Sequence, residues 1–399
     1  MGPLEGMRVI DLTHVMAGPT CTLMLADMGA DVIKVEKVPD GDDTRRSVPP
    51  KIGDEAAAFM MMNRNKRGIA LDLKTEGGRN VLQRLLAGAD VVVENYRPGT
   101  MAKLGFDYEE LRKENRGLIY CALSGFGRSG PYGHRGGFDL VAQAMSGLMS
   151  ITGEGPGRAP VKCGAPVTDI TCGILAAVGI LAAYTHRLQT GQGQMVDTSL
   201  LEAGIVQTYW QSAIALATGI APGPMGSAHP LNAPYQAFEC ADGWIVIGGS
   251  NQRNWLRTLE ALDAKQLADD PRFIDNAARM AHLKELEEVL ASHFKPLASA
   301  EALARFEAVG VPAGPVYDVL QMQADPQVRA RDMVTTVEHA REGEVETIGL
   351  PVKFSETPGK VTRGAPVYGQ HSREVLKEAG FEGTEIDTLL ADGAVIADD

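Results

Sequence analysis

The chain has 399 residues, of which 44% are hydrophobic, 22% charged and 6% aromatic, so its length suits two folded domains and its composition is that of an ordinary soluble globular protein. Its 38 Lys and Arg against 51 Asp and Glu give a net charge of −13, which disfavours a nucleic-acid-binding surface. Its 5 cysteines are scattered without a CxxC pair. We therefore expect no disulfide framework, no metal site and a cytoplasmic location. Residues 1–8 contain no apolar run, so we also expect no signal peptide.

The first half of the chain alternates short apolar runs with helical segments. We expect strands at residues 7–13, 31–36, 68–73, 90–94, 118–123 and 194–197, and helices at 19–28, 75–86, 138–150, 169–188 and 199–218. Strands separated by crossover helices predict an α/β fold with a doubly wound, Rossmann-like parallel sheet. In such sheets, ligands bind beyond the carboxyl ends of the strands.

The second half begins with a Pro/Gly-rich linker at residues 219–227. Residues 235–240 and 244–247 flank Ala241-Asp242-Gly243, which is typical of a β-hairpin, and helices are expected at 252–262, 276–293 and 300–309. This pattern predicts a smaller α+β domain over 228–320. The tail has too little apolar periodicity for its own core, so we expect a large domain built from 1–220 with 325–399.

The first strand–helix–strand unit, whose second strand ends in Glu36, also suggests a nicotinamide-binding protein. The loop between strand and helix, residues 13–19, lacks the glycine fingerprint of such proteins. Met16 and Pro19 stand where a pyrophosphate needs close backbone approach, and Pro19 has no N–H to offer a phosphate. The nicotinamide hypothesis is therefore disfavoured.

Asp169 is the most informative single residue, because it opens a nearly uncharged helix that continues through Tyr184. Free N–H groups and the positive end of the helix dipole would hold its carboxylate ionised and half desolvated, as a carboxylate nucleophile requires. On this stretch alone, a plain helix cap is the stronger alternative. The helix itself looks too short and too interrupted to span a membrane.

Many short motifs along the chain resemble those of the family III CoA transferases, also called the CaiB/BaiF family. A specific example is residues 93–99, Val-Glu-Asn-Tyr-Arg-Pro-Gly. The other segments that carry the resemblance are 10–13, 17–19, 29–36, 65–67, 71–74, 124–127, 130–132, Asp169, 190–194, 310–316 and 351–354. Formyl-CoA:oxalate CoA transferase and carnitine CoA transferase belong to this family, and α-methylacyl-CoA racemase is a divergent branch.

The resemblance implies a Rossmann-like large domain from both chain ends, a small inserted domain and an obligate homodimer of interlocked ring-like subunits. It implies a CoA transferase that moves CoA from an acyl-CoA to a carboxylic acid, without a prosthetic group. Asp169 matches the family's nucleophile, which forms a mixed anhydride and then an aspartyl-CoA thioester. This match favours the nucleophile over the helix cap.

The same resemblance implies a CoA-binding site. The residues that match it are Val15, Met16, Ala17, Lys37, Leu71, Leu73, Lys74, Asn95, Tyr96, Arg97, Lys103, Gly137, Phe138 and Asp139. Lys37, Lys74 and Lys103 are candidates for phosphate contacts, although lysines after strands are commonly solvated loop charges.

Two departures from the family's motifs limit which reaction and which acceptor acid we expect. The racemase branch has a catalytic His before the Asp that opens the helix at 138–150, whereas this chain has Phe138, which cannot transfer a proton. Racemisation or another CoA-ester reaction therefore remains only an alternative. Oxalate-specific enzymes have a Gln where this chain has Met16, so oxalate is disfavoured as the acceptor, and a larger carboxylate, such as a longer dicarboxylic acid, is the alternative.

Overall fold

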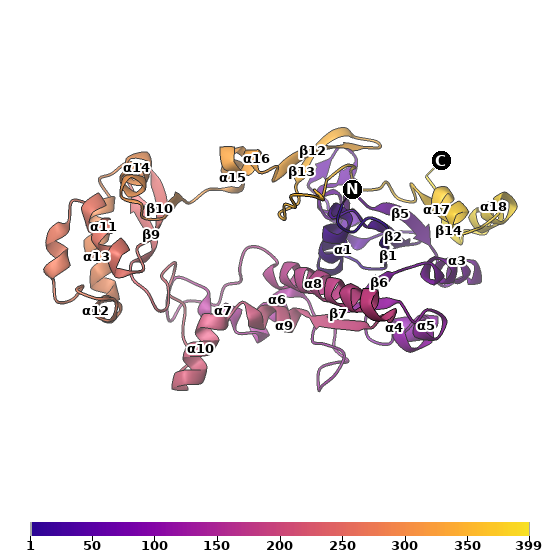
Figure 1. Ribbon diagram of the computed structural model, residues 1–399, viewed down its shortest axis with the longest axis horizontal. Coiled ribbons are helices and arrows are strands. Elements are labelled where there is room, and N and C mark those ends of the chain that lie inside the picture. The colour runs from indigo at the N-terminus through magenta and orange to yellow at the C-terminus, as the bar shows by residue number, and fades with distance from the viewer. Residues whose placement is uncertain (1, 399) are drawn as a thin grey trace. The chain divides into compact units, whose positions relative to one another are not determined.

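The computed structural model describes residues 2–398 and divides into two compact units (Figure 1). The larger unit contains residues 2–147, 163–207 and 326–398, and the smaller contains 148–162 and 208–325. The expected boundary at residue 220 differs from this division, because α10 (Tyr209–Thr218) is grouped with the smaller unit. None of the side chains of α10 is buried, so none anchors it in the core of the larger unit.

The larger unit is built on a seven-stranded sheet of order β14-β5-β2-β1-β6-β7-β8. The strands are β1 (Arg8–Asp11), β2 (Asp31–Lys37), β5 (Arg67–Leu71), β6 (Val91–Glu94), β7 (Ile119–Ser124), β8 (Met195–Ser199) and β14 (Val395–Ile396). All neighbours are parallel except β14, which pairs antiparallel with β5. The prediction of an α/β fold around a mainly parallel sheet is confirmed.

Helices cover both faces of this sheet, so its strands are apolar on both sides. Successive residues of a strand point to opposite faces, and accordingly Val9 belongs to one core cluster and Ile10 to the other. The first cluster includes side chains of α1 (Ala17–Asp27), α8 (Val167–Thr190) and α9 (Leu200–Val206). The second includes side chains of α3 (Glu76–Ala87), α5 (Tyr108–Glu114), α17 (Ser372–Glu378) and α18 (Gly383–Ala391).

The C-terminal tail packs on the N-terminal sheet. Val395 of β14 is in register with Leu71 of β5, and Figure 1 shows the yellow helices α17 and α18 close to the indigo strands. The tail also contains an antiparallel hairpin, β12 (Val334–His339) and β13 (Gly343–Ile348). Val337 and Val345 of this hairpin form a small core with Phe59 of α2 (Ala57–Asn63).

The helix α8 runs for 24 residues, so by length and composition it could cross a membrane. This corrects the expectation that it is too short. One face, which includes Cys172, Ala176 and Ile180, is buried in the core of the larger unit. Gly173 lies against the first loop so closely that a Cβ there would stand 2.5 Å from the carbonyl oxygen of Ala17. The packing of this face is that of a core helix.

The smaller unit has a three-stranded antiparallel sheet of order β11-β10-β9. Its strands are β9 (Tyr235–Cys240), β10 (Gly243–Gly248) and β11 (Ala313–Pro315). Its helices besides α10 are α7 (Leu148–Ile151), α11 (Gln252–Ala261), α12 (Asn276–Ala281), α13 (Leu283–Phe294), α14 (Ser299–Val309) and α15 (Val319–Ala324). Its separate core includes the stacked rings of Phe238, Phe294 and Phe306.

Candidate active site

A cavity of about 340 Å³ lies in the larger unit, beyond the carboxyl ends of β1, β6 and β7. This is the edge at which doubly wound sheets bind ligands. The sequence-predicted residues that line it are Val15, Met16, Ala17, Asn95, Tyr96, Arg97, Gly137, Phe138 and Asp169. The lining residues outside that prediction are His14, Asp43, Pro98, Leu123, Ser124, Gly125, Arg135, Gly136 and Leu200.

Asp169 lies in the first turn of α8 and faces this cavity. Among residues 2–398, its carboxylate has no hydrogen-bond or ion-pair partner. Burial, followed by the negative charge of Asp139, raises its pKa from 3.8 to about 6. Desolvation therefore outweighs the helix dipole, and Asp169 is a more basic carboxylate than the helix terminus alone would give, although it is still mostly ionised at pH 7.

Capping of α8 falls to a different residue, Asp139, at the start of α6 (Asp139–Met145). Its Oδ1 accepts hydrogen bonds from the backbone N–H of Thr168, at 2.9 Å, and from the Thr168 hydroxyl, at 2.7 Å. Its Oδ2 accepts from Gln143 at 2.7 Å. Asp139 was expected to bind CoA, but it does not line the cavity and its oxygens serve to fix the start of α8. Asp169 is thereby left free of a capping role.

The first loop, residues 13–19, is held in an unusual backbone conformation. Val15 has a φ of 69°, in the left-handed region that a β-branched residue rarely adopts. Asn95 clamps the preceding residue: its Oδ1 accepts from the His14 N–H at 2.9 Å, and its Nδ2 donates to the His14 carbonyl at 2.8 Å. The Asn95 amide therefore positions the wall of the cavity, and backbone strain of this kind is typical of functional sites.

Four buried charges lie beneath this loop, and the sequence analysis assigned none of them to the site. Lys34 pairs with Asp42 at 2.8 Å, and Lys66 pairs with Asp11 at 3.0 Å; all four side chains are inaccessible to solvent. The Lys34 ammonium also donates to the Thr13 carbonyl at 2.8 Å.

Asp42 connects this buried ion pair to the strained residue, because its Oδ1 accepts from the Val15 N–H at 3.3 Å. Burial alone would raise the pKa of Asp42, but the Lys34 ammonium and its hydrogen bond lower it well below its usual range. Asp42 is therefore an ionised acceptor for the loop.

Five further predicted residues lie outside the cavity lining: Lys37, Leu71, Leu73, Lys74 and Lys103. Lys37 and Leu71 are in register at the carboxyl ends of β2 and β5. The Lys37 ammonium pairs with Asp43, a lining residue, at 2.7 Å. Lys74 and Lys103 are exposed.

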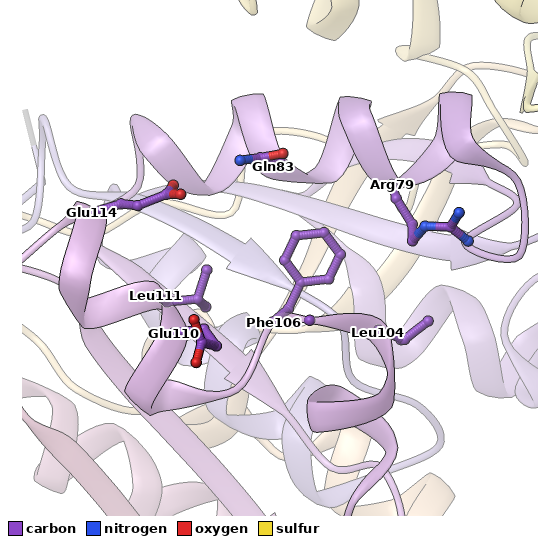
Figure 2. Close-up of a pocket in the computed structure, with 8 residues that line it drawn as sticks. Arg79, Gln83, Leu104, Phe106, Glu110, Leu111 and Glu114 are labelled. Carbon is purple, nitrogen blue, oxygen red and sulfur yellow. The ribbon is translucent and has the colours of Figure 1, made fainter.

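A second hollow of about 240 Å³ lies between α3 and the segment that contains α4 (Thr100–Leu104) and α5 (Figure 2). Arg79 borders it and donates to the carbonyl oxygens of Leu73, at 3.3 Å, and Lys74, at 2.8 Å. The guanidinium therefore holds the loop after β5. Figure 2 shows Phe106 and Leu111 within this hollow, alongside the carboxylates of Glu110 and Glu114. Such a lining does not suit a polyphosphate ligand.

Comparison with known proteins identifies the family of this chain. The model of CoA-transferase family III matches residues 4–372. The chain belongs to this family. A succinate–glutarate CoA-transferase of Agrobacterium fabrum is 40% identical to it over 94% of this chain and 95% of that protein. A succinyl-CoA:mesaconate CoA-transferase of Haloarcula hispanica is 41% identical over 98% of this chain and 100% of that protein.

A solved structure shares the fold at high sequence identity. The crystal structure of a CaiB/BaiF family protein from Brucella suis matches with a TM-score of 0.84 and 39% identity, over 95% of this chain and 99% of that one. The prediction of a family III CoA transferase is confirmed. The protein is an enzyme that transfers CoA between an acyl-CoA and a carboxylic acid, with CoA thioesters as substrates.

Proposed function

We propose that Asp169 is the covalent nucleophile of this CoA transfer and that the cavity beside it holds the thioester. The observation that carries this proposal is the state of the Asp169 carboxylate. It is half-buried, faces the cavity and has no hydrogen-bond donor among residues 2–398. A carboxylate without donors keeps its electron pairs available for attack, and a pKa of about 6 leaves it mostly ionised at neutral pH.

The reaction proceeds through exchanges between acyl bonds of similar energy. Asp169 attacks the thioester carbonyl, the C–S bond breaks, and a mixed anhydride forms with release of CoA thiolate. The thiolate attacks the aspartyl carbonyl of the anhydride, giving an aspartyl-CoA thioester and the donor's free carboxylate.

In the second half, the acceptor carboxylate attacks the aspartyl thioester, the C–S bond breaks, and a new anhydride forms with release of CoA thiolate. The thiolate then attacks the acceptor's acyl carbonyl, which releases the new acyl-CoA and regenerates Asp169. The anhydride and the thioester both hydrolyse, so exclusion of water from the cavity matters.

We place CoA along the carboxyl edge of the sheet. Asp169 and Phe138 line the cavity, which marks the thioester end, and Lys37 and Leu71 lie side by side at the ends of β2 and β5. From β7 to β5 is four strand spacings, or about 19 Å at ~4.8 Å each, which suits an extended pantetheine arm. In this placement Lys37, Lys74 and Lys103 are the candidates for the phosphates, and Arg97 lies between the two ends.

We infer that the physiological acids are short dicarboxylic acids. The Agrobacterium and Haloarcula relatives are named for succinate, glutarate and mesaconate, each of which carries two carboxylates.

We also propose that the enzyme is a homodimer, because α8 exposes an apolar stripe that includes Ile174, at 40%, and Val178, at 58%. Exposed apolar stripes of this kind are typical of protein interfaces.

The nucleophile is tested with Asp169→Asn, which keeps the shape of the side chain and removes its charge. We expect the variant to fold and bind succinyl-CoA but to form no glutaryl-CoA from glutarate. In the wild type incubated with succinyl-CoA, hydroxylamine should convert the aspartyl thioester into a hydroxamate on the peptide that contains Asp169, as detected by mass spectrometry. Substantial transfer by Asp169→Asn would exclude the aspartyl intermediate.

A further inference from the structure

Two of the residues that line the cavity are arginines without a charged partner among residues 2–398. Among residues 2–398, the guanidinium groups of Arg97 and Arg135 form no ion pair and donate no hydrogen bond. The cavity's other peripheral charge, Asp43, is neutralised by Lys37 at 2.7 Å and Arg46 at 2.6 Å. Both arginines are exposed where they border the cavity, so their guanidinium groups are accessible to an anionic ligand that enters it.

The loop after β7 turns back so that Arg135 lies at this cavity. Its two ends meet at Gly125 and Gly137, where a Cβ on either residue would stand 2.6 Å from the Cα of the other. The loop is anchored by Arg128, which donates to Glu94 at the end of β6 at 2.8 Å. The guanidinium of Arg135 lies over the ring of Tyr132, 4.2 Å from its centroid. This stacking restricts the guanidinium without consuming its N–H donors.

The positions of the two arginines along the sheet separate their roles. Arg97 follows β6, nearer in strand order to β2 and Lys37, where we place the CoA phosphates. Arg135 belongs to the loop after β7 and precedes Asp139, which contacts Thr168 next to Asp169. Arg135 is therefore the unpaired cation on the side of the reacting carboxylate.

We propose that Arg135 binds the distal carboxylate of the acyl group and so makes the enzyme prefer dicarboxylic over monocarboxylic acids. This inference rests on the proposed function, because it takes Asp169 as the point of reaction. A dicarboxylic acid uses one carboxylate in the thioester, and the other stays ionised. That second negative charge enters a partly desolvated cavity beside Asp169 and needs a compensating cation. The planar guanidinium can donate two parallel hydrogen bonds to it.

The test is an internal competition between two five-carbon acids that differ in the distal carboxylate. Wild-type enzyme receives succinyl-CoA with equal concentrations of glutarate and pentanoate, and mass spectrometry gives the ratio of glutaryl-CoA to pentanoyl-CoA. Because both acids compete for the same enzyme intermediate, this ratio is independent of the donor step. We expect Arg135→Gln to lower the ratio by about 10- to 100-fold. Arg135→Lys keeps the charge but cannot donate two parallel hydrogen bonds, so we expect it to lower the ratio less.

The matched control is Arg112→Gln. Arg112 also lies over a tyrosine, 5.4 Å from the ring centroid of Tyr108, but it lies outside the cavity. Its substitution should leave the ratio unchanged. An unchanged ratio in folded Arg135→Gln, alongside an active wild type, would overturn the role of Arg135 and leave the proposed function intact. A wild type that forms neither product would instead overturn the proposed function, and the inference with it.

Discussion

At the scale of single residues, the start of α8 is capped by Asp139 and not by the aspartate of its own first turn, Asp169. Asp139 caps α8 through Thr168, and Asp169, in the same first turn, keeps a carboxylate without donors. Burial and the proximity of Asp139 make the ionised form of Asp169 unfavourable, which raises its pKa. A desolvated carboxylate of this kind lowers the stability of the folded protein at neutral pH.

Asp169→Asn should therefore be more stable than the wild type at neutral pH. The folded pKa of about 6 exceeds the ordinary 3.8, so the folded wild type holds the proton more tightly and loses stability as pH rises through this window. Above pH 7 we expect the variant to gain about 1–3 kcal/mol, a gain that disappears near pH 4, where Asp169 is protonated. Urea unfolding at both pH values measures the difference. Equal stability of the two proteins at pH 7.5 would contradict a raised pKa of Asp169 in the folded protein.

The sequence could locate Asp169, because a lone charge before an apolar run is a local signal. It could not assign the cap to Asp139, which is 29 residues away from its partner Thr168. Arg135 was missed for a similar reason: only the close approach of Gly125 and Gly137 shows that its loop returns to the cavity. Contacts between distant residues leave no periodic pattern in a single sequence.

At the scale of elements, the first loop depends on the buried charges beneath it. The strain at Val15 persists because Asp42 and Asn95 bind its neighbourhood and Lys34 binds the Thr13 carbonyl. A buried ion pair adds little net stability, but removal of one partner leaves an uncompensated charge in the core.

Asp42→Asn should consequently destabilise the protein by about 3–5 kcal/mol, because Lys34 loses its counter-ion while fully buried. The neighbouring Asp43→Asn is the matched control. Asp43 is 49% exposed, and its partners Lys37 and Arg46 are exposed to a similar degree. We therefore expect Asp43→Asn to lower the free energy of unfolding by less than about 1 kcal/mol. Urea unfolding of the two variants at pH 7.5 makes the comparison. Similar stability of both would exclude the buried pair as the support of the loop.

Most elements were predictable because they follow strong periodic patterns. The strands of the parallel sheet and the helices α1, α3 and α8 lie within a few residues of their expected positions. The differences occur at local breaks: the helix expected at 138–150 is interrupted at Gly147, whose φ is 89°, and the one at 276–293 is interrupted at His282. The hairpin β12–β13 was missed because its outward residues are polar and its core is shared with α2.

At the scale of the whole molecule, the larger unit is closed by segments from opposite ends of the chain. Val395 and Ile396 extend the sheet at β5, and Arg67 at the start of β5 pairs with Glu374 and Glu378 of α17. The smaller unit lies between these segments in sequence. We propose that two such chains interlock in a homodimer, the arrangement that the family resemblance implies.

The proposed homodimer can be tested at the apolar stripe of α8. Ile174 and Val178 are one helical turn apart on the face opposite Cys172 and Ala176, and both are exposed in the single chain. If a second copy covers the stripe and the two chains interlock, the dimer can separate only by unfolding. We expect analytical ultracentrifugation to give the mass of a dimer down to nanomolar concentration.

Val178→Asp places a charge in this interface and tests the same surface during assembly. After unfolding in urea and refolding by dilution, the wild type should recover as a dimer, whereas the variant should accumulate monomer or aggregate because a buried carboxylate opposes association. Light scattering coupled to size exclusion measures both species. A wild type that dissociates into folded monomers on dilution would contradict the interlocked arrangement. A variant that refolds to dimer as efficiently as the wild type would show that this stripe of α8 lies outside the interface.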